Sequence, residues 1–231
     1  MVRFDMSEYQ QKESLSRFIG SPDGKLAGSL TEAIIQRPYS LILLDEFEKA
    51  HPDILNLFLQ VFDDGRLTDS LGRVVDFQNT IIIATSNAHS VYIQDQIASG
   101  KAISDFSEEL KKKLFDYFKP ELINRFSDVV VFKPLSVENI ASIARMNLDN
   151  LSQALMDAQG VELSFDDDAV NKIAQIGYDP TFGARPLRKA IDDNIKSVLS
   201  KKILSGDVVH GQKISVSLDS AGGFKFSQLN Q

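Results

Sequence analysis

The sequence predicts an α/β fold, in which a parallel-sheet unit is followed by a smaller unit of mixed α+β structure. Two almost fully apolar runs, residues 41–44 and 80–84, have the composition of buried parallel strands, and a helical pattern separates them. Each run ends in polar residues, as strands do at the ligand-binding edge of an open α/β sheet. The pattern changes near residue 134, so we expect a first unit at residues 1–134 and a second at 135–231.

The first unit is expected to alternate strands and helices. Pro52 is typical of a first helical turn, and the apolar residues after it recur at spacings of three and four. In order, we expect a strand at 2–5, a polar helix at 7–18, a loop at 19–29, a helix at 30–36, a strand at 41–45, a helix from 52 to 62, a hairpin at 66–77, a strand at 80–85, an exposed segment at 88–107, a helix at 108–118, a short helix from 120 and a buried strand at 129–132.

Two polar residues mark helix starts in the second unit. Ser136 and Asp166 each precede apolar residues at helical spacing, and both residue types are common N-caps. The expected elements are a helix from 136, an edge strand at 161–165, a helix from 166 to 176, a longer helix from 183 to about 204 and a closing hairpin of residues 213–218 and 224–226.

The composition argues against several classes of function. The 231 residues carry a formal net charge of -7, and binding to nucleic acid or to anionic membranes needs a cationic surface. No apolar stretch is long enough for a membrane span. The chain has no cysteine and only three scattered histidines, so thiolate chemistry is excluded and a multi-histidine metal site is disfavoured.

Asp45 and Glu46 are the strongest candidates for chemistry. They follow the first apolar run directly, so we expect them at the carboxyl end of a buried strand. In phosphoryl transfer, one such carboxylate holds Mg²⁺, usually through water, and the other orients or deprotonates the attacking water. A buried strand that ends in an acidic turn explains these two residues equally well when they are taken alone.

Asn87 and Arg125 extend the candidate site, and each also has an ordinary structural explanation. Asn87 follows the strand at 80–85, where it can bind the attacking water or a phosphate oxygen, or can simply turn the chain. Arg125 can stabilise the charge on a transferred phosphoryl group. It can equally form a surface ion pair with Glu121 or Asp128.

Arg185 is the candidate in the second unit. It stands at the start of the long helix, where it can reach a nucleotide or pair with Asp179. Each of these residues is a weak signal alone, and the specific signal is their order and spacing along the chain.

That order and spacing strongly resemble the second ATPase module of Clp-type AAA+ chaperones, which are ring-forming unfoldases and disaggregases. The resemblance covers nearly the whole chain. It is carried by PYSLILLDEFEKAHPD at 38–53, LQVFDDGRLTD at 59–69, TSN at 85–87, FKPELINR at 118–125 and FGARPLR at 182–188, with DMSEY at 5–9 and LTEA at 30–33.

The resemblance implies a fold and a set of roles. The first unit would be the AAA+ large subdomain without its first strand and phosphate-binding loop, and the second unit would be a small C-terminal lid. Asp45 would serve Mg²⁺ as the first Walker B carboxylate, and Glu46 would activate water as the second. Asn87 would be sensor 1, Arg125 the arginine finger offered to a neighbouring subunit, and Arg185 sensor 2.

The same resemblance implies cofactors and partners. The cofactors would be ATP and Mg²⁺. The partners would be like subunits in a hexameric ring and unfolded or aggregated polypeptide clients, with no nucleic acid and no membrane. We expect a cytoplasmic protein.

The sequence departs from the family at the phosphate-binding loop. A Walker A element needs Gly-x-x-x-x-Gly-Lys-Ser/Thr, so that backbone N–H groups and the lysine hold the phosphates. Residues 20–26 have only three residues between their glycines, and Leu26 stands where a hydroxyl would bind Mg²⁺. By the resemblance, the absent strand lies between those at 80–85 and 129–132. We therefore expect a fragment, a truncated gene product or one part of a complex.

Two loops depart from the family as well. Residues 24–28 stand where the family carries a pore loop with an aromatic residue, but Lys25 and Leu26 occur here in a shorter segment. No Ile/Leu-Gly-Phe/Leu tripeptide occurs in residues 88–107, so docking to a ring protease is disfavoured.

Three interpretations of function remain open at this point. The first is part of an ATP-driven unfoldase or disaggregase, with this chain inactive alone. The second is a non-catalytic ring subunit or assembly module that offers Arg125 to the site of a neighbour. The third is an isolated piece whose function belongs to its parent protein.

Overall fold

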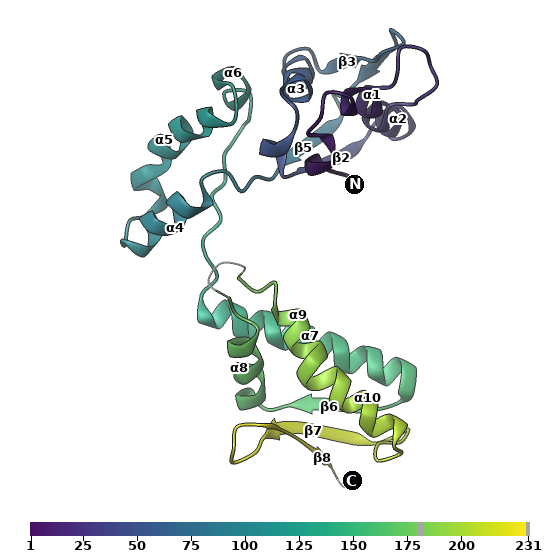
Figure 1. Ribbon diagram of the computed structural model, residues 1–231, viewed down its shortest axis with the longest axis vertical. Coiled ribbons are helices and arrows are strands. Elements are labelled where there is room, and N and C mark those ends of the chain that lie inside the picture. The colour runs from purple at the N-terminus through teal and green to yellow at the C-terminus, as the bar shows by residue number, and fades with distance from the viewer. Residues whose placement is uncertain (180–182, 230–231) are drawn as a thin grey trace. The chain divides into compact units, whose positions relative to one another are not determined.

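The chain divides into two compact units, Met1–Lys133 and Pro134–Gln231. A computed structural model describes residues 1–179 and 183–229, and Figure 1 shows their elements. Phe182, which belongs to one of the motifs above, lies outside the described residues. Within the described ranges, no helix is both long enough and apolar enough to cross a membrane.

The first unit is built on a parallel sheet. Its strands are β1 (Val2–Asp5), β2 (Ser40–Asp45) and β5 (Thr80–Ala84), in the order β1-β2-β5. Asp5 lies opposite Asp45, so these strands end together at one edge of the sheet. The predicted parallel arrangement is confirmed.

Helices and one small hairpin accompany this sheet (Figure 1). They confirm the expected helices at 30–36 and from 52, the hairpin at 66–77 and the short helix from 120. In chain order, these elements are η1 (Met6–Tyr9), α1 (Ser14–Ile19), α2 (Ser29–Gln36), η2 (Phe47–Lys49), α3 (Pro52–Asp64), β3 (Arg66–Thr68), β4 (Val74–Asp76), α4 (Ser90–Ala98), α5 (Ile103–Lys113), η3 (Leu114–Asp116) and α6 (Pro120–Ile123).

The helix predicted at 7–18 is wrong as one element, because the chain breaks after Tyr9. The carboxylate of Asp5 accepts the N–H of Ser7 at 3.0 Å and caps the short 3₁₀ helix η1. The carbonyl of Tyr9 then accepts the N–H of His51 at 2.9 Å, a distant partner that replaces a helical one. Helix α1 begins afresh at Ser14. The helix predicted at 108–118 also differs, since α5 begins at Ile103 and ends at Lys113.

Aromatic side chains fill the core around the turn that follows β2. Phe47 is 1% exposed and meets Phe58 of α3 edge-to-face, with ring centroids 5.5 Å apart. Phe118 stacks on Phe47 at 5.6 Å, and Phe126 meets it edge-to-face at 6.2 Å. Such ring pairs add to the stability that comes from burying the rings. This packed cluster of aromatic rings therefore fixes the turn that carries Glu46.

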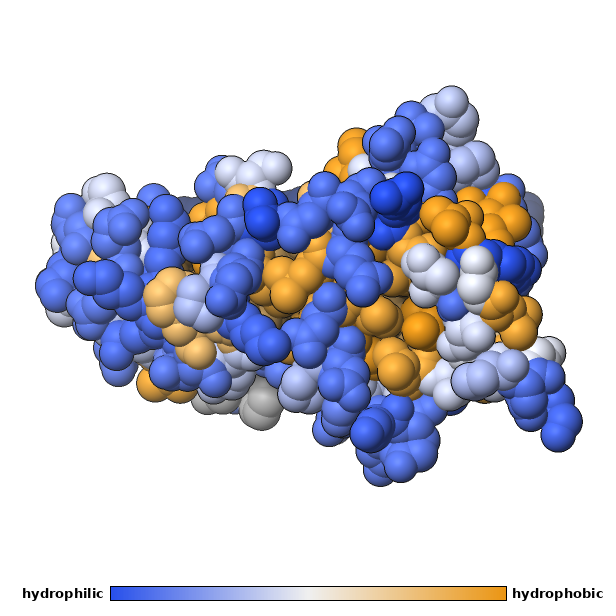
Figure 2. Space-filling view, turned by 90° about the horizontal axis from the view of Figure 1, so that it is seen from above, coloured by the Kyte–Doolittle hydropathy of each residue, from blue (hydrophilic) through white to orange (hydrophobic). Residues whose placement is uncertain are grey.

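The buried strand predicted at 129–132 is wrong. These residues form no strand, and Val130 and Phe132 are 70% and 85% exposed. Among the described residues, β5 pairs only with β2, and Ile81 on β5 is 65% exposed. Residues 129–132 thus have no neighbouring strand to satisfy their backbone groups, which a ladder requires. The space-filling view shows apolar surface among polar residues (Figure 2).

The second unit packs helices against a mixed sheet. Strand β6 (Glu162–Phe165) pairs in parallel with β7 (Lys213–Leu218), which pairs antiparallel with β8 (Phe224–Gln228). Its helices are α7 (Val137–Gln159), α8 (Asp167–Ile176), α9 (Leu187–Ile191) and α10 (Ser197–Leu204). Ser136 and Asp166 accept backbone N–H groups at the starts of α7 and α8, so both predicted N-caps are confirmed, as are the edge strand and the hairpin.

The longer helix predicted from 183 to about 204 begins instead at Leu187, ends at Leu204 and contains one wide turn. Residues Asp192–Lys196 between α9 and α10 are π-helical. Four residues spaced four apart, Leu187, Ile191, Ile195 and Leu199, are all at most 5% exposed. A regular α-helix has 3.6 residues per turn, so such a spacing drifts by about 40° at each step. The wide turn takes up part of this drift and keeps all four side chains on the core.

Candidate functional site

The carboxyl ends of β2 and β5 are joined through Asp45. The hydroxyl of Thr85 donates to Oδ1 of Asp45 at 2.5 Å, and the guanidinium of Arg3, on β1, donates to Oδ2. These two side-chain hydrogen bonds, with that from Thr85 the larger effect, hold the pKa of Asp45 below its usual range. Asp45 is therefore ionised at neutral pH, as a magnesium ligand must be.

Glu46 sits in an unusual backbone conformation at the same edge. Its φ of 55° and ψ of 47° are left-handed, which is uncommon for a residue other than glycine. Its Oε2 lies 2.6 Å from Nζ of Lys49, and the Glu46 side chain is 30% exposed. The left-handed turn thus places a carboxylate beside Asp45 in sequence, and a cation holds it.

Asn87 is brought to this edge by hydrogen bonds that continue beyond the β2–β5 ladder. The N–H of Phe47 donates to the carbonyl of Thr85 at 2.9 Å. The backbone N–H of Asn87 donates to Oε1 of Glu48 at 3.3 Å, while the Asn87 residue itself is exposed. The carbonyl of Asn87 accepts from Ser90 at 3.2 Å, so it also turns the chain into α4.

Arg125 follows α6 in the same unit, and its partner differs from those considered from the sequence. Nε of Arg125 lies 2.7 Å from Oδ1 of Asp63, at the end of α3, rather than at Glu121 or Asp128. Both side chains are about half exposed, so the guanidinium remains open to solvent. A surface ion pair of this kind contributes little to stability and breaks readily.

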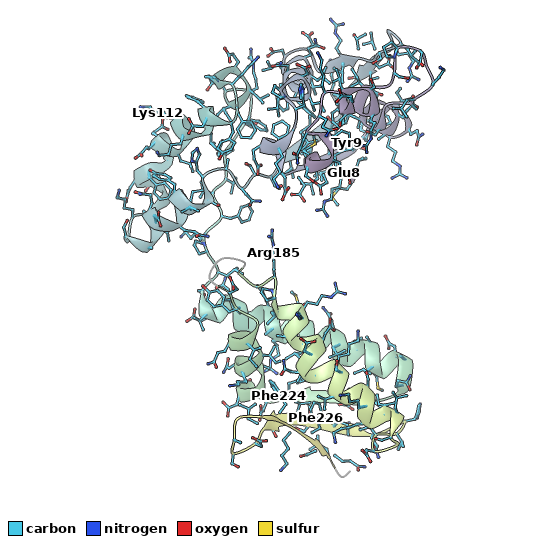
Figure 3. All side chains as sticks on the ribbon, viewed as in Figure 1. Glu8, Tyr9, Lys112, Arg185, Phe224 and Phe226 are labelled. Atoms are coloured by element: carbon cyan, nitrogen blue, oxygen red, sulfur yellow. The ribbon has the colours of Figure 1, made fainter. Side chains whose placement is uncertain are left out.

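Arg185 belongs to the second unit. It stands in the segment before α9 and is exposed, and Figure 3 shows its side chain extending away from that helix. The backbone nearby is fixed by a bridge in which Asp179 and Gly183 exchange hydrogen bonds of 3.0 and 2.7 Å. Of the five candidate residues, the structure brings three together at one sheet edge, namely Asp45, Glu46 and Asn87.

Sequence reasoning missed four residues that support this edge. Arg3, Thr85, Glu48 and Lys49 each contact one of the candidates through a side chain. Lys49 carried a local signal, because a lysine three residues after a glutamate is a common ion pair on a turn or helix. The contacts of Arg3 and Thr85 depend on the strand register, which the sequence does not contain.

The oxygen ligands at this edge fit Mg²⁺, although they do not form a protein cage. Among the described residues, no group of three or more His, Cys, Asp or Glu side chains is placed to hold a metal ion. Mg²⁺ commonly binds through one or two carboxylates, with water and substrate phosphates as its other ligands. The ionised carboxylate of Asp45 meets that requirement, and bound Mg²⁺ would neutralise charge on phosphate oxygens.

Comparison with known proteins identifies the family. Residues 1–129 match the family model described as AAA domain (Cdc48 subfamily). The chain belongs to the AAA domain family. Residues 135–216 match a second model, the C-terminal, D2-small domain of ClpB protein. The two matches confirm the predicted α/β large subdomain followed by a small C-terminal domain, and the resemblance to the second ATPase module of Clp-type chaperones.

Individual relatives of this AAA domain chain support the same family. It is 46% identical over 226 residues to chaperone protein ClpB of Meiothermus ruber, which covers 96% of this chain and 26% of that protein. It is 47% identical over 232 residues to chaperone protein ClpB of Bacteroides thetaiotaomicron, with 96% and 27% covered. It is 43% identical over 242 residues to the ATP-dependent Clp protease ATP-binding subunit ClpC of Staphylococcus aureus, with 100% and 29% covered. The chain thus spans about a quarter of the length of these relatives.

Proposed function

We propose that this chain forms the Walker B, sensor, arginine-finger and lid part of an ATP-driven protein unfoldase or disaggregase. The observation that carries the proposal is the meeting of Asp45, Glu46 and Asn87 at the carboxyl edge of the AAA sheet, with Asp45 held ionised. Open α/β sheets bind their ligands at that edge. Carboxylates and an amide are the groups that a phosphoryl-transfer site uses to bind Mg²⁺ and to orient water.

The roles at this edge are divided by geometry and charge. Asp45 serves Mg²⁺ through water, because Arg3 and Thr85 already engage its two oxygens. Glu46 accepts the proton of the attacking water once its carboxylate turns from Lys49. Asn87 orients that water or a terminal phosphate oxygen through its exposed side chain.

The two arginines act on the phosphates from outside this edge. Arg125, which is half exposed, serves a neighbouring subunit as an arginine finger and leaves Asp63 to do so. Arg185 reads the bound nucleotide from the lid. These roles require like subunits in a hexameric ring, ATP as the nucleotide and polypeptides as the clients. We place the protein in the cytoplasm and propose that it does not dock a ring protease.

One observation favours an alternative function. The sequence holds no Gly-x-x-x-x-Gly-Lys-Ser/Thr element, so it has no lysine and hydroxyl with which to hold a β- or γ-phosphate. The chain alone is therefore expected to be inactive. A non-catalytic subunit that offers Arg125 to a neighbour's site is the second candidate.

The first test is nucleotide binding by the chain itself. Titration with a fluorescent ATP analogue and Mg²⁺ is expected to give no saturable binding, and Asp45→Asn is the control. Binding that Asp45→Asn abolishes would mean that this chain holds phosphates without a Walker A loop. That result would contradict the proposal that this chain holds only the Walker B, sensor, arginine-finger and lid part of the site.

The second test supplies the missing loop. In a chimaera, this chain replaces the matched segment of the Meiothermus ruber ClpB, to which it is 46% identical, and the first ATPase module is inactivated so that turnover reports the second module alone. The chimaera is expected to hydrolyse ATP, and Glu46→Gln is expected to abolish turnover while nucleotide stays bound. Turnover by the Glu46→Gln chimaera at the unsubstituted rate would remove Glu46 from its role. A chimaera that assembles and binds ATP but never hydrolyses it would favour the non-catalytic subunit.

A further inference from the structure

Glu48 occupies a position that stability alone does not explain. It lies in η2, two residues after Glu46, and its Oε1 accepts the backbone N–H of Asn87 at 3.3 Å. Its Oε2 is shielded from solvent and has no hydrogen-bond partner among the described residues. A carboxylate oxygen that is withdrawn from water without a partner costs free energy. A neutral side chain would fill this place at a lower cost.

The contacts of Glu48 differ from those of its charged neighbours. Lys49 points its ammonium group to Glu46, at 2.6 Å, and not to Glu48. Asp45 is engaged by Arg3 and by Thr85. Within the described part of the chain, Glu48 is the side chain from the β2 side of the site that reaches Asn87.

The hydrogen bond between Asn87 and Glu48, called the tie below, lies beyond the last paired residues of the sheet. The β2–β5 register ends at Leu44 and Ala84, and backbone bonds then join Thr85 to Leu44 and to Phe47, each at 2.9 Å. Asn87 lies two residues further on and is exposed. Its remaining backbone bond, to Ser90, is local and does not relate it to Asp45 or Glu46.

We propose that Glu48 is a positioning residue that sets the place of Asn87 relative to the carboxylates of Asp45 and Glu46. This inference rests on the proposed function for its consequence, because it matters for turnover only if Asn87 acts on water or phosphate. The 3.3 Å bond is long for an N–H donor, and such bonds at catalytic sites often tighten when ligand binds. Glu48 therefore acts through Asn87 and touches no reacting atom.

The hydrogen bond between Asn87 and Glu48 is tested without nucleotide, by hydrogen exchange of the chain followed by NMR. A backbone N–H that donates to a side-chain oxygen exchanges with solvent more slowly than one that is free. Glu48→Ala is expected to speed hydrogen exchange at the Asn87 amide at least fivefold. Glu48→Gln keeps an oxygen acceptor and is expected to change this rate less than twofold. An exchange rate at Asn87 that Glu48→Ala leaves unchanged would overturn the tie.

The consequence is tested in the ClpB chimaera, by comparing turnover with nucleotide affinity. Glu48→Ala is expected to lower ATP turnover at least tenfold and to change nucleotide affinity less than twofold, and Glu48→Gln to restore turnover to within threefold. Glu13→Ala, at an exposed glutamate before α1, is the matched control and is expected to leave turnover unchanged. If Asn87→Ala abolishes turnover but Glu48→Ala does not, the positioning role is wrong.

Failure of the proposed function gives a different pattern. In that case Asn87→Ala leaves turnover unaltered, or the unsubstituted chimaera does not hydrolyse ATP, whatever the hydrogen exchange at Asn87 shows. Either result overturns the consequence for catalysis. Should Glu48→Ala prevent folding, Glu48→Asp, which shortens the side chain by one methylene, decides the tie through hydrogen exchange at the Asn87 amide.

Discussion

The ammonium group of Lys49 lies 2.6 Å from Oε2 of Glu46, three residues earlier in the chain. The hydrogen bond to Glu46 is the main cause that raises the pKa of Lys49 above its ordinary 10.5. Glu46 is thus held by a cation of its own turn, and any water that it activates must compete with that contact.

Glu46→Gln is expected to lower the pKa of Lys49 toward its ordinary value, because the amide removes the charge that favours the ammonium form. The measurement is the ¹³Cε shift of Lys49 on titration. A raised pKa adds stability that is complete below the unfolded pKa and is lost as pH rises through the folded one. Glu46→Gln should therefore weaken the loss of stability at alkaline pH. An unchanged Lys49 titration would contradict the contact.

Asp69→Asn is expected to destabilise the first unit by about 2–3 kcal/mol. The side chain of Asp69 is 1% exposed and accepts from the N–H groups of Leu71 and Arg73 and from Nε of Arg73, at 2.6–2.9 Å. The other end of the Arg73 guanidinium reaches Glu32 of α2 at 2.5 Å. Urea unfolding gives the free-energy change, and Asp95→Asn, at an exposed residue of α4, is the matched control.

The same residue gives a pH dependence with a definite sign. Burial by itself would raise the pKa of Asp69, but the hydrogen bonds from Arg73 and from two backbone N–H groups outweigh it, so the pKa is lowered. The stability from Asp69 is therefore present above its unfolded pKa of about 3.9 and is lost as pH falls through the folded value. When the free energy of unfolding is measured from pH 7 downward, the loss that Asp69 causes should be absent in Asp69→Asn. If both proteins lose the same stability at acid pH, this contribution from Asp69 is wrong.

Arg125→Ala is expected to change the free energy of unfolding of the chain by less than about 1 kcal/mol, since its ion pair with Asp63 is half exposed. In the ClpB chimaera, the same substitution should lower turnover by about 10³-fold or more, the range for an arginine finger, and spare nucleotide binding. Mixed rings of Arg125→Ala and Glu46→Gln subunits test whether the arginine acts across the interface. Recovery of no activity in such mixtures would argue against action in trans.

Phe132→Ser is expected to shift the free energy of unfolding by no more than about 0.5 kcal/mol, because its side chain is 85% exposed. Phe47→Ala should cost about 3–5 kcal/mol, because this ring is 1% exposed and packed among other rings. Comparing the two variants by urea unfolding tests whether residues 129–132 lie outside the core. A large loss for Phe132→Ser would restore the buried strand that the sequence predicts.

Local patterns predicted most elements of the fold because their causes are local. Ser136 and Asp166 cap helices with their own side chains, and the apolar run before Asp45 forms its strand as expected. Two of the differences from the prediction have distant causes. The helix at 7–18 breaks where Tyr9 bonds to His51, and residues 129–132 lack a strand beside them.

The candidate site divides in the same way. Asp45, Glu46 and Asn87 were found from strand ends, which adjacent sequence marks. The contacts that hold them come from Arg3, Thr85 and Glu48, whose separations along the chain are 42, 40 and 39 residues. Contacts between residues so far apart along the chain leave no periodic pattern in the sequence. The roles of Arg125 and Arg185 remain predictions, because they depend on what each arginine meets when nucleotide and neighbouring subunits are bound.

The wide turn at Asp192–Lys196 gives the second unit one place where its long helix can change length. The turn behaves as one residue inserted into an otherwise regular helix, and it absorbs that residue so that the side chains on both sides still face the core. Removing a single residue there would leave Ile191, Ile195 and Leu199 at spacings of three and four, which a regular α-helix keeps on one face. Removing a residue from the middle of α7 instead would turn every later position of that helix by about 100°.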